Sequence, residues 1–148
     1  MYWIFIVIVI VIAGGSVWWW RGKSATMRTA TLVVGAHSFA VEVADTFPLR
    51  AQGLSGRENL EENHGMLFLF NTAGNHPFWM KDMKFALDFV WINGNKVVGT
   101  KENVSPKGSM LSLPIYYPPE EVDMVLELAA GTVARLGVKV GDGVGVRK

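Results

Sequence analysis

The chain has 148 residues, of which 14 are Lys or Arg and 13 are Asp or Glu, and 50% of them are hydrophobic. The basic residues are scattered along the chain, so nucleic-acid binding has no electrostatic support. The absence of cysteine excludes disulfides, thiolate catalysis and cysteine-ligated metal sites.

Residues 2–20 form the first element, and their sequence predicts a membrane anchor. Of the first 20 residues, 17 are apolar and none is charged. A helix over residues 2–20 would be about 29 Å long, which is close to the hydrocarbon thickness of a bilayer. The tryptophans at 18–20 would lie at the membrane interface, and basic residues follow them. We therefore predict one transmembrane helix within residues 1–22, followed by a tether at residues 23–28.

A cleaved signal peptide is the alternative to an anchor. No Lys or Arg precedes the apolar run, and no clean cleavage site precedes Met27, so an uncleaved anchor is favoured. Arg21, Lys23 and Arg28 all follow the span, and by the positive-inside rule they would place the domain in the cytoplasm. That rule is weak for a first helix with a one-residue tail, so the charges leave the side of the membrane open.

Residues 29–148 are predicted to form a single β-rich domain. Short β-branched and aromatic runs alternate with turn residues, and two segments look helical. Thr46 can cap a short helix that has Pro48 in its first turn and Gly53 near its end. The predicted strands are residues 29–34, 38–43, 66–70, 78–80, 87–92, 96–98, 122–128 and 144–147, with a second helical turn over 131–136.

Two hairpins are expected in this domain. A three-residue loop at 35–37 would close the first hairpin, and the Asn-Gly-Asn turn at 93–95 would close the second. Seven or more short strands with one or two short helices are typical of a β-sandwich or a distorted barrel. The fold class is therefore mainly β.

The order of several motifs along the domain carries a family resemblance. The motifs are Arg50-Ala51-Gln52-Gly53-Leu54 with Arg57, Gly65-Met66-Leu67-Phe68, Phe78-Trp79-Met80-Lys81, Leu87-Asp88, Val125-Leu126-Glu127-Leu128 with Gly131, and Gly141-Asp142. Together they resemble the domain of unknown function 192 family, also called uncharacterised protein family 0127, over roughly residues 38–147. One departure is Met83, where the family pattern leads us to expect Thr.

The resemblance implies a jelly-roll-like, mostly β fold and no established activity. Similar proteins are often bacterial or archaeal and often carry an N-terminal export signal or anchor. This origin favours a domain outside the cytoplasm, against the charge rule, and we adopt that side as the expectation.

Asp88 is the first candidate functional residue, because it lies in a strand that is apolar on both faces. A buried carboxylate needs a partner, and we expect one of Arg57, Arg50 or Lys81 to supply it. The simpler interpretation is a structural ion pair. The alternative is a shared ligand-binding site in which Asp88, Arg57 and Lys81 surround a pocket with Trp79 as a stacking face.

The spacing of the Phe78-Trp79-Met80-Lys81 motif permits this shared site. In an extended segment Trp79 and Lys81 point to one side, while Phe78 and Met80 point to the other. The alternative for Trp79 is simple core filling. Arg50 is a secondary candidate for the same site.

Glu127 is the other secondary candidate. It shares a strand face with Asp123 and Val125, opposite apolar residues, so we expect it to be exposed to solvent. With Asp88 it could form an acid/base pair of a hydrolase, although no diagnostic nucleophile motif is present and no catalytic residue is assigned. The three histidines have no metal-ligand spacing, so neither a metal nor a cofactor is predicted.

These observations predict a membrane-anchored β domain at the cell envelope that binds a small molecule, a glycan or a peptide. A hydrolase that uses Asp88 and Glu127 is one alternative, and a structural module that binds partner proteins is the other. The aromatic-proline stretch at 116–119 could contact a protein, or could pack as a loop on the domain.

Overall fold

The computed structural model describes residues 27–106 and 113–147. The predicted anchor at residues 2–20 lies outside these residues. Within them, no helix has the length and apolar character needed to cross a bilayer. The strands are β1 (Arg28–Val34), β2 (His37–Ala44), β3 (His64–Gly74), β4 (Phe78–Trp79), β5 (Leu87–Asn93), β6 (Lys96–Val104), β7 (Ile115–Tyr116), β8 (Val122–Ala129) and β9 (Val144–Arg147), and the helices are α2 (Phe47–Gln52) and α3 (Thr132–Leu136).

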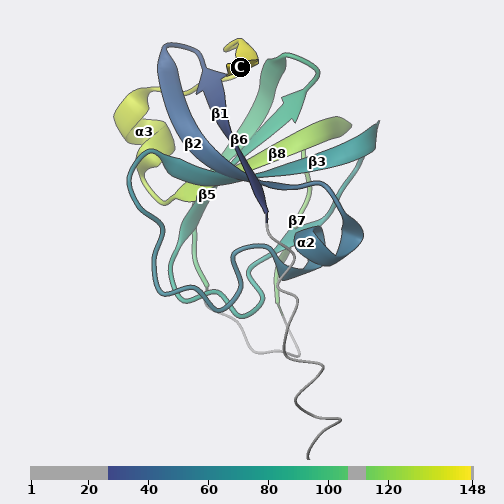
Figure 1. The fold of residues 1–148 in the computed structure, drawn as a ribbon, viewed down its shortest axis with the longest axis vertical. Coiled ribbons are helices and arrows are strands. Elements are labelled where there is room, and N and C mark those ends of the chain that lie inside the picture. The colour runs from purple at the N-terminus through teal and green to yellow at the C-terminus, as the bar shows by residue number, and fades with distance from the viewer. Residues whose placement is uncertain (1–26, 107–112, 148) are drawn as a thin grey trace, which may run out of the picture.

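Seven of these strands form one twisted sheet, in the order β6-β5-β8-β3-β2-β1-β9, and β4 pairs with β7 in a second sheet (Figure 1). All the pairs are antiparallel except β2 with β3, which are parallel because α2 and a long loop connect them. The sheet is not closed into a barrel. In the described residues, one isolated bridge from Lys96 to Gly143 joins its two edges.

The expected mainly β fold with one or two short helices is confirmed. The finer expectation of a jelly-roll-like sandwich or distorted barrel is not, because seven strands lie in one sheet that does not close. The first hairpin is present, but its loop has two residues rather than three, because Val34 pairs directly with His37. Gly35 adopts φ +58° in this loop, a conformation that suits glycine. Strand β7 is not among the predicted strands, and its Tyr116 begins the aromatic-proline stretch at 116–119.

The central strands are buried on both faces, so the domain has two apolar cores. On β3, Leu67 faces the core that α3 covers, whereas Met66 and Phe68 face the core that α2 covers. Figure 1 shows the two helices on opposite sides of the sheet. This arrangement confirms the prediction that residues 66–70 form a strand buried on both faces.

Strand β8 lies between β3 and β5 in the middle of the sheet. Gly65 permits the close approach of β3 to β8, because a Cβ at this position would lie 2.8 Å from the carbonyl oxygen of Glu127. Because β8 is buried on both faces, Glu127 is buried as well.

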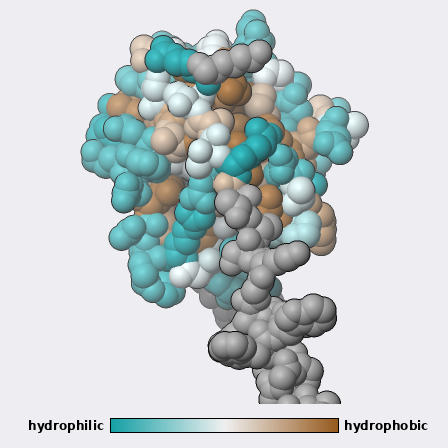
Figure 2. All heavy atoms as spheres, viewed as in Figure 1, coloured by the Kyte–Doolittle hydropathy of each residue, from teal (hydrophilic) through white to brown (hydrophobic). Residues whose placement is uncertain are grey.

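On the face shown in Figure 2, apolar residues form separate patches among hydrophilic side chains.

Candidate functional site

A pocket of about 420 Å³ lies on the α2 side of the sheet, and we call it the α2–β4 pocket. Helix α2 and the turn after it form one wall, β3 and β4 form another, and β8 contributes one side chain. Its lining residues are Phe47, Arg50, Ala51, Gln52, Gly53, Leu54, Ser55, Phe68, Phe70, Pro77, Phe78, Trp79, Lys81, Met83 and Glu127. The volume falls within the range of small-molecule sites.

The first turn of α2 is fixed by its N-cap. The Thr46 hydroxyl accepts a hydrogen bond from the backbone N–H of Leu49, and Pro48 suits the start of a helix because it needs no backbone donor there. Leu49 is buried under the helix. This packing holds the exposed face of α2, with Phe47 and Ala51, at the mouth of the pocket.

Aromatic rings form most of the pocket wall. Phe68 and Phe78 meet edge to face with their ring centroids 5.0 Å apart, and Phe70 meets Phe78 at 6.4 Å. Phe68 and Phe78 are buried, whereas Trp79 is 50% exposed and Phe47 is more exposed still. The pocket therefore has a buried aromatic floor and an open aromatic mouth.

Glu127 is the acidic group of this pocket. It is 5% exposed, and its direct neighbours on the adjacent strands are Met66 of β3 and Phe89 of β5, which are both fully buried. Within the described part of the chain, no group donates a hydrogen bond to its carboxylate or forms an ion pair with it. Burial raises the pKa of Glu127 to about 8, so the carboxyl is mostly protonated at neutral pH.

The prediction that Glu127 is exposed to solvent was wrong. Its strand carries apolar residues on one face and Glu127 with Val125 on the other. In a sheet that packs on a core through only one face, this pattern would place Glu127 on the solvent-exposed face. Here the second face is covered by the α2 core, in which Val125 is fully buried. The strand pattern by itself could not show that cover.

Arg50 and Lys81 are the basic groups of the pocket. The Arg50 guanidinium lies 5.1 Å from the centroid of the Phe70 ring and donates a hydrogen bond to the backbone oxygen of Leu69 at 2.8 Å. Lys81 is exposed at the mouth. Neither forms an ion pair with Glu127.

Asp88 lies on the other face of the sheet. It is fully buried, and its two oxygens accept hydrogen bonds from the backbone N–H groups of Asn103, at 2.8 Å, and Val133, at 2.9 Å. The first donor belongs to an irregular part of the β5–β6 pairing, and the second to the first turn of α3. The prediction of a cationic partner was wrong, because backbone donors satisfy this carboxylate.

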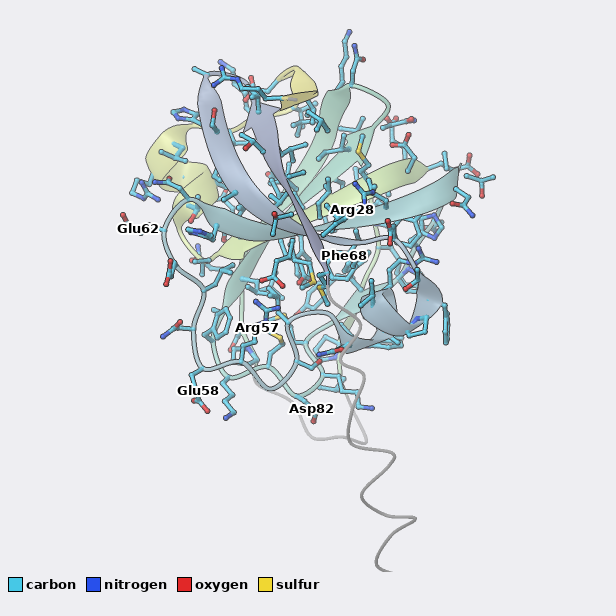
Figure 3. All side chains as sticks on the ribbon, in the orientation of Figure 1. Arg28, Arg57, Glu58, Glu62, Phe68 and Asp82 are labelled. Carbon is cyan, nitrogen blue, oxygen red and sulfur yellow. The ribbon has the colours of Figure 1, made fainter. Side chains whose placement is uncertain are left out.

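Arg57 has a different partner, the carboxylate of Glu42 on β2. Its two terminal nitrogens donate to the two oxygens of Glu42 at 2.5 and 2.8 Å. This contact lowers the pKa of Glu42 and raises the pKa of Arg57. Figure 3 places Arg57 among the loops below the sheet, whereas α3 lies at the upper left. Arg57 is therefore engaged by Glu42 and not by Asp88, whose oxygens accept from Asn103 and Val133, and it is not among the residues that line the α2–β4 pocket.

Of the four residues predicted to share one site, Trp79 and Lys81 line the α2–β4 pocket, whereas Asp88 and Arg57 do not. The secondary candidates Arg50 and Glu127 also line the pocket, and Met80 is buried outside the lining. Phe78 is also buried, but it lines the same pocket, because β4 ends at Trp79 and the predicted alternation does not continue to Lys81. Core filling by Trp79 is excluded by its exposure. Five further lining residues were not predicted to belong to a site, namely Phe47, Gln52, Ser55, Phe68 and Phe70.

Residues 27–106 and 113–147 contain no group of three or more His, Asp or Glu side chains that could hold a metal ion. The donor set of the α2–β4 pocket is one carboxyl, two basic side chains and a few neutral polar groups. Such a set suits hydrogen bonding to an organic ligand better than metal coordination.

Comparison with known proteins identifies the family. Residues 30–146 match DUF192, described as an uncharacterized ancient conserved region. The chain belongs to the DUF192 family. No curated protein matches the sequence.

Two solved structures resemble this DUF192 chain. A protein of Sinorhizobium meliloti 1021, described as a proposed transcription regulator, is 32% identical and superposes with a TM-score of 0.77, covering 84% of this chain and 98% of that chain. A protein of unknown function from Novosphingobium aromaticivorans DSM 12444 is 28% identical with a TM-score of 0.75, covering 84% of this chain and 89% of that chain.

Three of the motifs that carry the DUF192 resemblance meet at the α2–β4 pocket. The motif at 50–54 forms the end of α2 and the turn after it, the motif at 78–81 forms β4 and its exit, and the motif at 125–128 contributes Glu127. Met83, where the family pattern leads us to expect Thr, also lines the pocket. In this chain that departure makes the pocket more apolar.

Proposed function

We propose that this DUF192 protein is a membrane-anchored binding module whose α2–β4 pocket holds a compact, mainly apolar small molecule. The observation that carries the proposal is Glu127, a buried carboxyl without a partner in an aromatic pocket of about 420 Å³. Apolar walls with a few polar groups are the usual composition of a ligand site. An unpaired buried polar group costs stability unless a ligand or water satisfies it.

The membrane part of the proposal rests on the sequence. The uncharged apolar run at residues 2–20 would anchor the domain, and the family origin favours the outer side of the membrane. Protease added to intact cells should then degrade the domain. Protection of the domain until the cells are lysed would contradict this orientation.

The geometry disfavours the hydrolase alternative. Asp88 is paired with Leu128 on β8, and its neighbour Phe89 is paired with Glu127, so the two carboxyl groups point to opposite faces of the sheet. Both oxygens of Asp88 are also engaged with backbone donors. A pair placed in this way cannot act on the two sides of one bond.

Transcription regulation, which the description of the Sinorhizobium meliloti protein names, receives no support from the charges of this chain. Basic and acidic residues nearly balance, and the formal net charge is +1. DNA-binding domains carry a clustered basic surface. A ligand pocket serves a sensor or carrier role without contact to nucleic acid.

The test is a thermal-shift screen of the full-length chain in a nonionic detergent. A ligand present at a hundred times its Kd stabilises its protein by about 3 kcal/mol. Ala51→Trp would fill the mouth of the pocket from an exposed position of α2, and Ala134→Trp would place the same side chain on the exposed face of α3. Compounds in the pocket should stabilise the wild type and Ala134→Trp but not Ala51→Trp. Equal stabilisation of both variants, or no stabilising compound, would refute the pocket as a site.

A further inference from the structure

Glu127 and the rings around it also indicate the chemistry of the ligand. We infer that the α2–β4 pocket recognises a compound with one ammonium group and an apolar body, and that the ammonium group pairs with the Glu127 carboxylate. This inference rests on the proposed function, because it requires that the pocket be a ligand site. It goes further by naming the charge of the group that the ligand brings to Glu127.

The first argument is the missing partner of Glu127. The other buried acid of the sheet, Asp88, has two hydrogen-bond donors at 2.8 and 2.9 Å, so this fold satisfies a carboxylate where it needs one for structure. Glu127 is nearly as buried, lines a pocket and has no donor among the described residues. An ammonium ligand would supply three N–H donors and the opposite charge.

The second argument is the aromatic lining. The faces of aromatic rings attract cations, and this attraction strengthens where water is excluded. Phe68 and Phe78 lie on the buried floor together with Glu127, and Trp79 stands at the mouth. The structure already uses this contact once, since the Arg50 guanidinium lies over the ring of Phe70. A carboxylate and aromatic rings are the two kinds of group that favour an ammonium ion.

The basic residues limit the ligand to one positive charge. Arg50 and Lys81 line the same pocket and would repel a second cation. They would instead favour a neutral or anionic far end, so the inferred class includes simple aralkylamines and zwitterions but not polyamines. Lys81 lies at the exposed mouth, where solvent weakens its repulsion of an ammonium group on the buried floor.

The pH dependence of the affinity distinguishes an ammonium ligand from a neutral ligand. An ammonium ligand needs the ionised carboxylate, whereas a neutral hydrogen-bond acceptor needs the protonated form. Because burial raises the pKa of Glu127 to about 8, the affinity for an alkylammonium should increase about 50-fold between pH 6 and pH 8. The affinity for a neutral acceptor should not increase over that range.

Other groups near this face could also titrate, so the design includes a variant that removes only Glu127. Arg50 comes from α2, Lys81 follows β4, the Glu42–Arg57 pair lies beyond Met66, and Lys101 lies beyond Phe89. Two histidines also lie on this side, since His64 is two residues before Met66 on β3 and His76 stacks on the ring of Phe70. All these charged or titratable groups remain in Glu127→Gln.

The experiment measures binding of three matched probes to the full-length chain by isothermal titration calorimetry at pH 6, 7 and 8. The probes are 2-phenylethylamine, its neutral N-acetyl derivative and 3-phenylpropionate. An alkylammonium, like that of lysine, loses its proton only near pH 10, so the first probe stays charged throughout. Calorimetry in two buffers of different ionisation enthalpy gives the number of protons released on binding. We expect about 0.9 proton released per 2-phenylethylamine bound at pH 7.

The expected result is tighter binding of 2-phenylethylamine than of the other two probes, with the 50-fold pH dependence. Glu127→Gln should abolish both this preference and the proton release. Glu121→Gln, which removes an exposed carboxylate just before β8, should change neither. Equal binding of the amine and its N-acetyl derivative, weaker binding at pH 8 than at pH 6, or no binding of the amine would each overturn the inference.

The proposed function fails by a different result. If the neutral or anionic probe binds the wild type and Ala134→Trp but not Ala51→Trp, the pocket is a ligand site and the inference about ammonium alone is wrong. If Ala51→Trp binds every probe as the wild type does, the pocket itself is refuted.

Discussion

Replacing Glu127 by Gln should change the pH dependence of the protein's stability, so that the variant gains stability relative to wild type as the pH rises. Burial raises the pKa of this carboxyl from the ordinary value of 4.5 to about 8. Between these two values the folded chain holds one more proton than the unfolded chain. The contribution of Glu127 to stability is therefore complete below pH 4.5 and is lost as the pH rises towards 8.

The magnitude follows from the size of the shift. Each pKa unit corresponds to about 1.4 kcal/mol, so a shift from 4.5 to about 8 corresponds to roughly 5 kcal/mol over the whole window. About 3 kcal/mol of this is lost by pH 7, and about 1 kcal/mol by pH 5. Gln carries no titrating proton. The free energy of unfolding of Glu127→Gln, relative to wild type, should therefore increase by about 2 kcal/mol or slightly more between pH 5 and pH 7.

The assay is urea denaturation of the full-length chain in a nonionic detergent, followed by far-ultraviolet circular dichroism at pH 5, 6 and 7. All other titrating groups are common to the two proteins, so their effects cancel in the difference. The exposed-site variant Glu121→Gln should show a constant difference from wild type over the same range. A constant difference for Glu127→Gln as well would refute the claim that its carboxyl is desolvated and unpaired.

Three further predictions concern the structure around the site. Asp88→Asn keeps one acceptor oxygen for two backbone donors, so it should lower the free energy of unfolding by about 1–3 kcal/mol in urea titrations, and no loss would contradict its structural role. Gly65→Ala places a Cβ 2.8 Å from a carbonyl oxygen of β8, so it should destabilise the fold by roughly 1–3 kcal/mol in the same assay, and a neutral effect would show that β3 and β8 separate easily. The Arg57–Glu42 pair is about one third exposed, so a double-mutant cycle with alanine should give less than about 1 kcal/mol, and a larger coupling would mean that solvent screens it less than its exposure implies.

Most of the strands could be predicted because each shows a local pattern. The hairpin of β1 and β2 follows from two β-branched runs around a glycine loop, and β3 follows from an uninterrupted apolar run. Strand β7 could not be predicted in this way. It consists of Ile115 and Tyr116, and its pairing with Phe78 and Trp79 of β4 is a contact between distant segments that a local pattern does not show.

The candidate site could be predicted only in part, and for a physical reason. Trp79 and Lys81 both line the pocket, but so does Phe78, which strand alternation placed on the other side, because β4 ends at Trp79. Which elements surround these residues is a property of the whole fold. The α2 segment that faces Trp79 across the pocket is distant in sequence, so Phe47 and the turn after α2 showed no sign of belonging to one site.

The two buried carboxyl groups show why residue type and burial do not by themselves identify a functional residue. Asp88 and Glu127 occupy neighbouring positions of the β5–β8 pairing, since Asp88 pairs with Leu128 and Phe89 pairs with Glu127. A shift of one position along a strand turns the side chain to the opposite face. On one face the fold brings backbone donors to both oxygens of Asp88, and one of these hydrogen bonds holds the first turn of α3. On the other face the fold leaves Glu127 without a donor beside an open pocket. The carboxyl without a protein donor is the one that a ligand would stabilise, so the presence or absence of donors, rather than acidity or burial, separates the candidate site from the structural carboxylate.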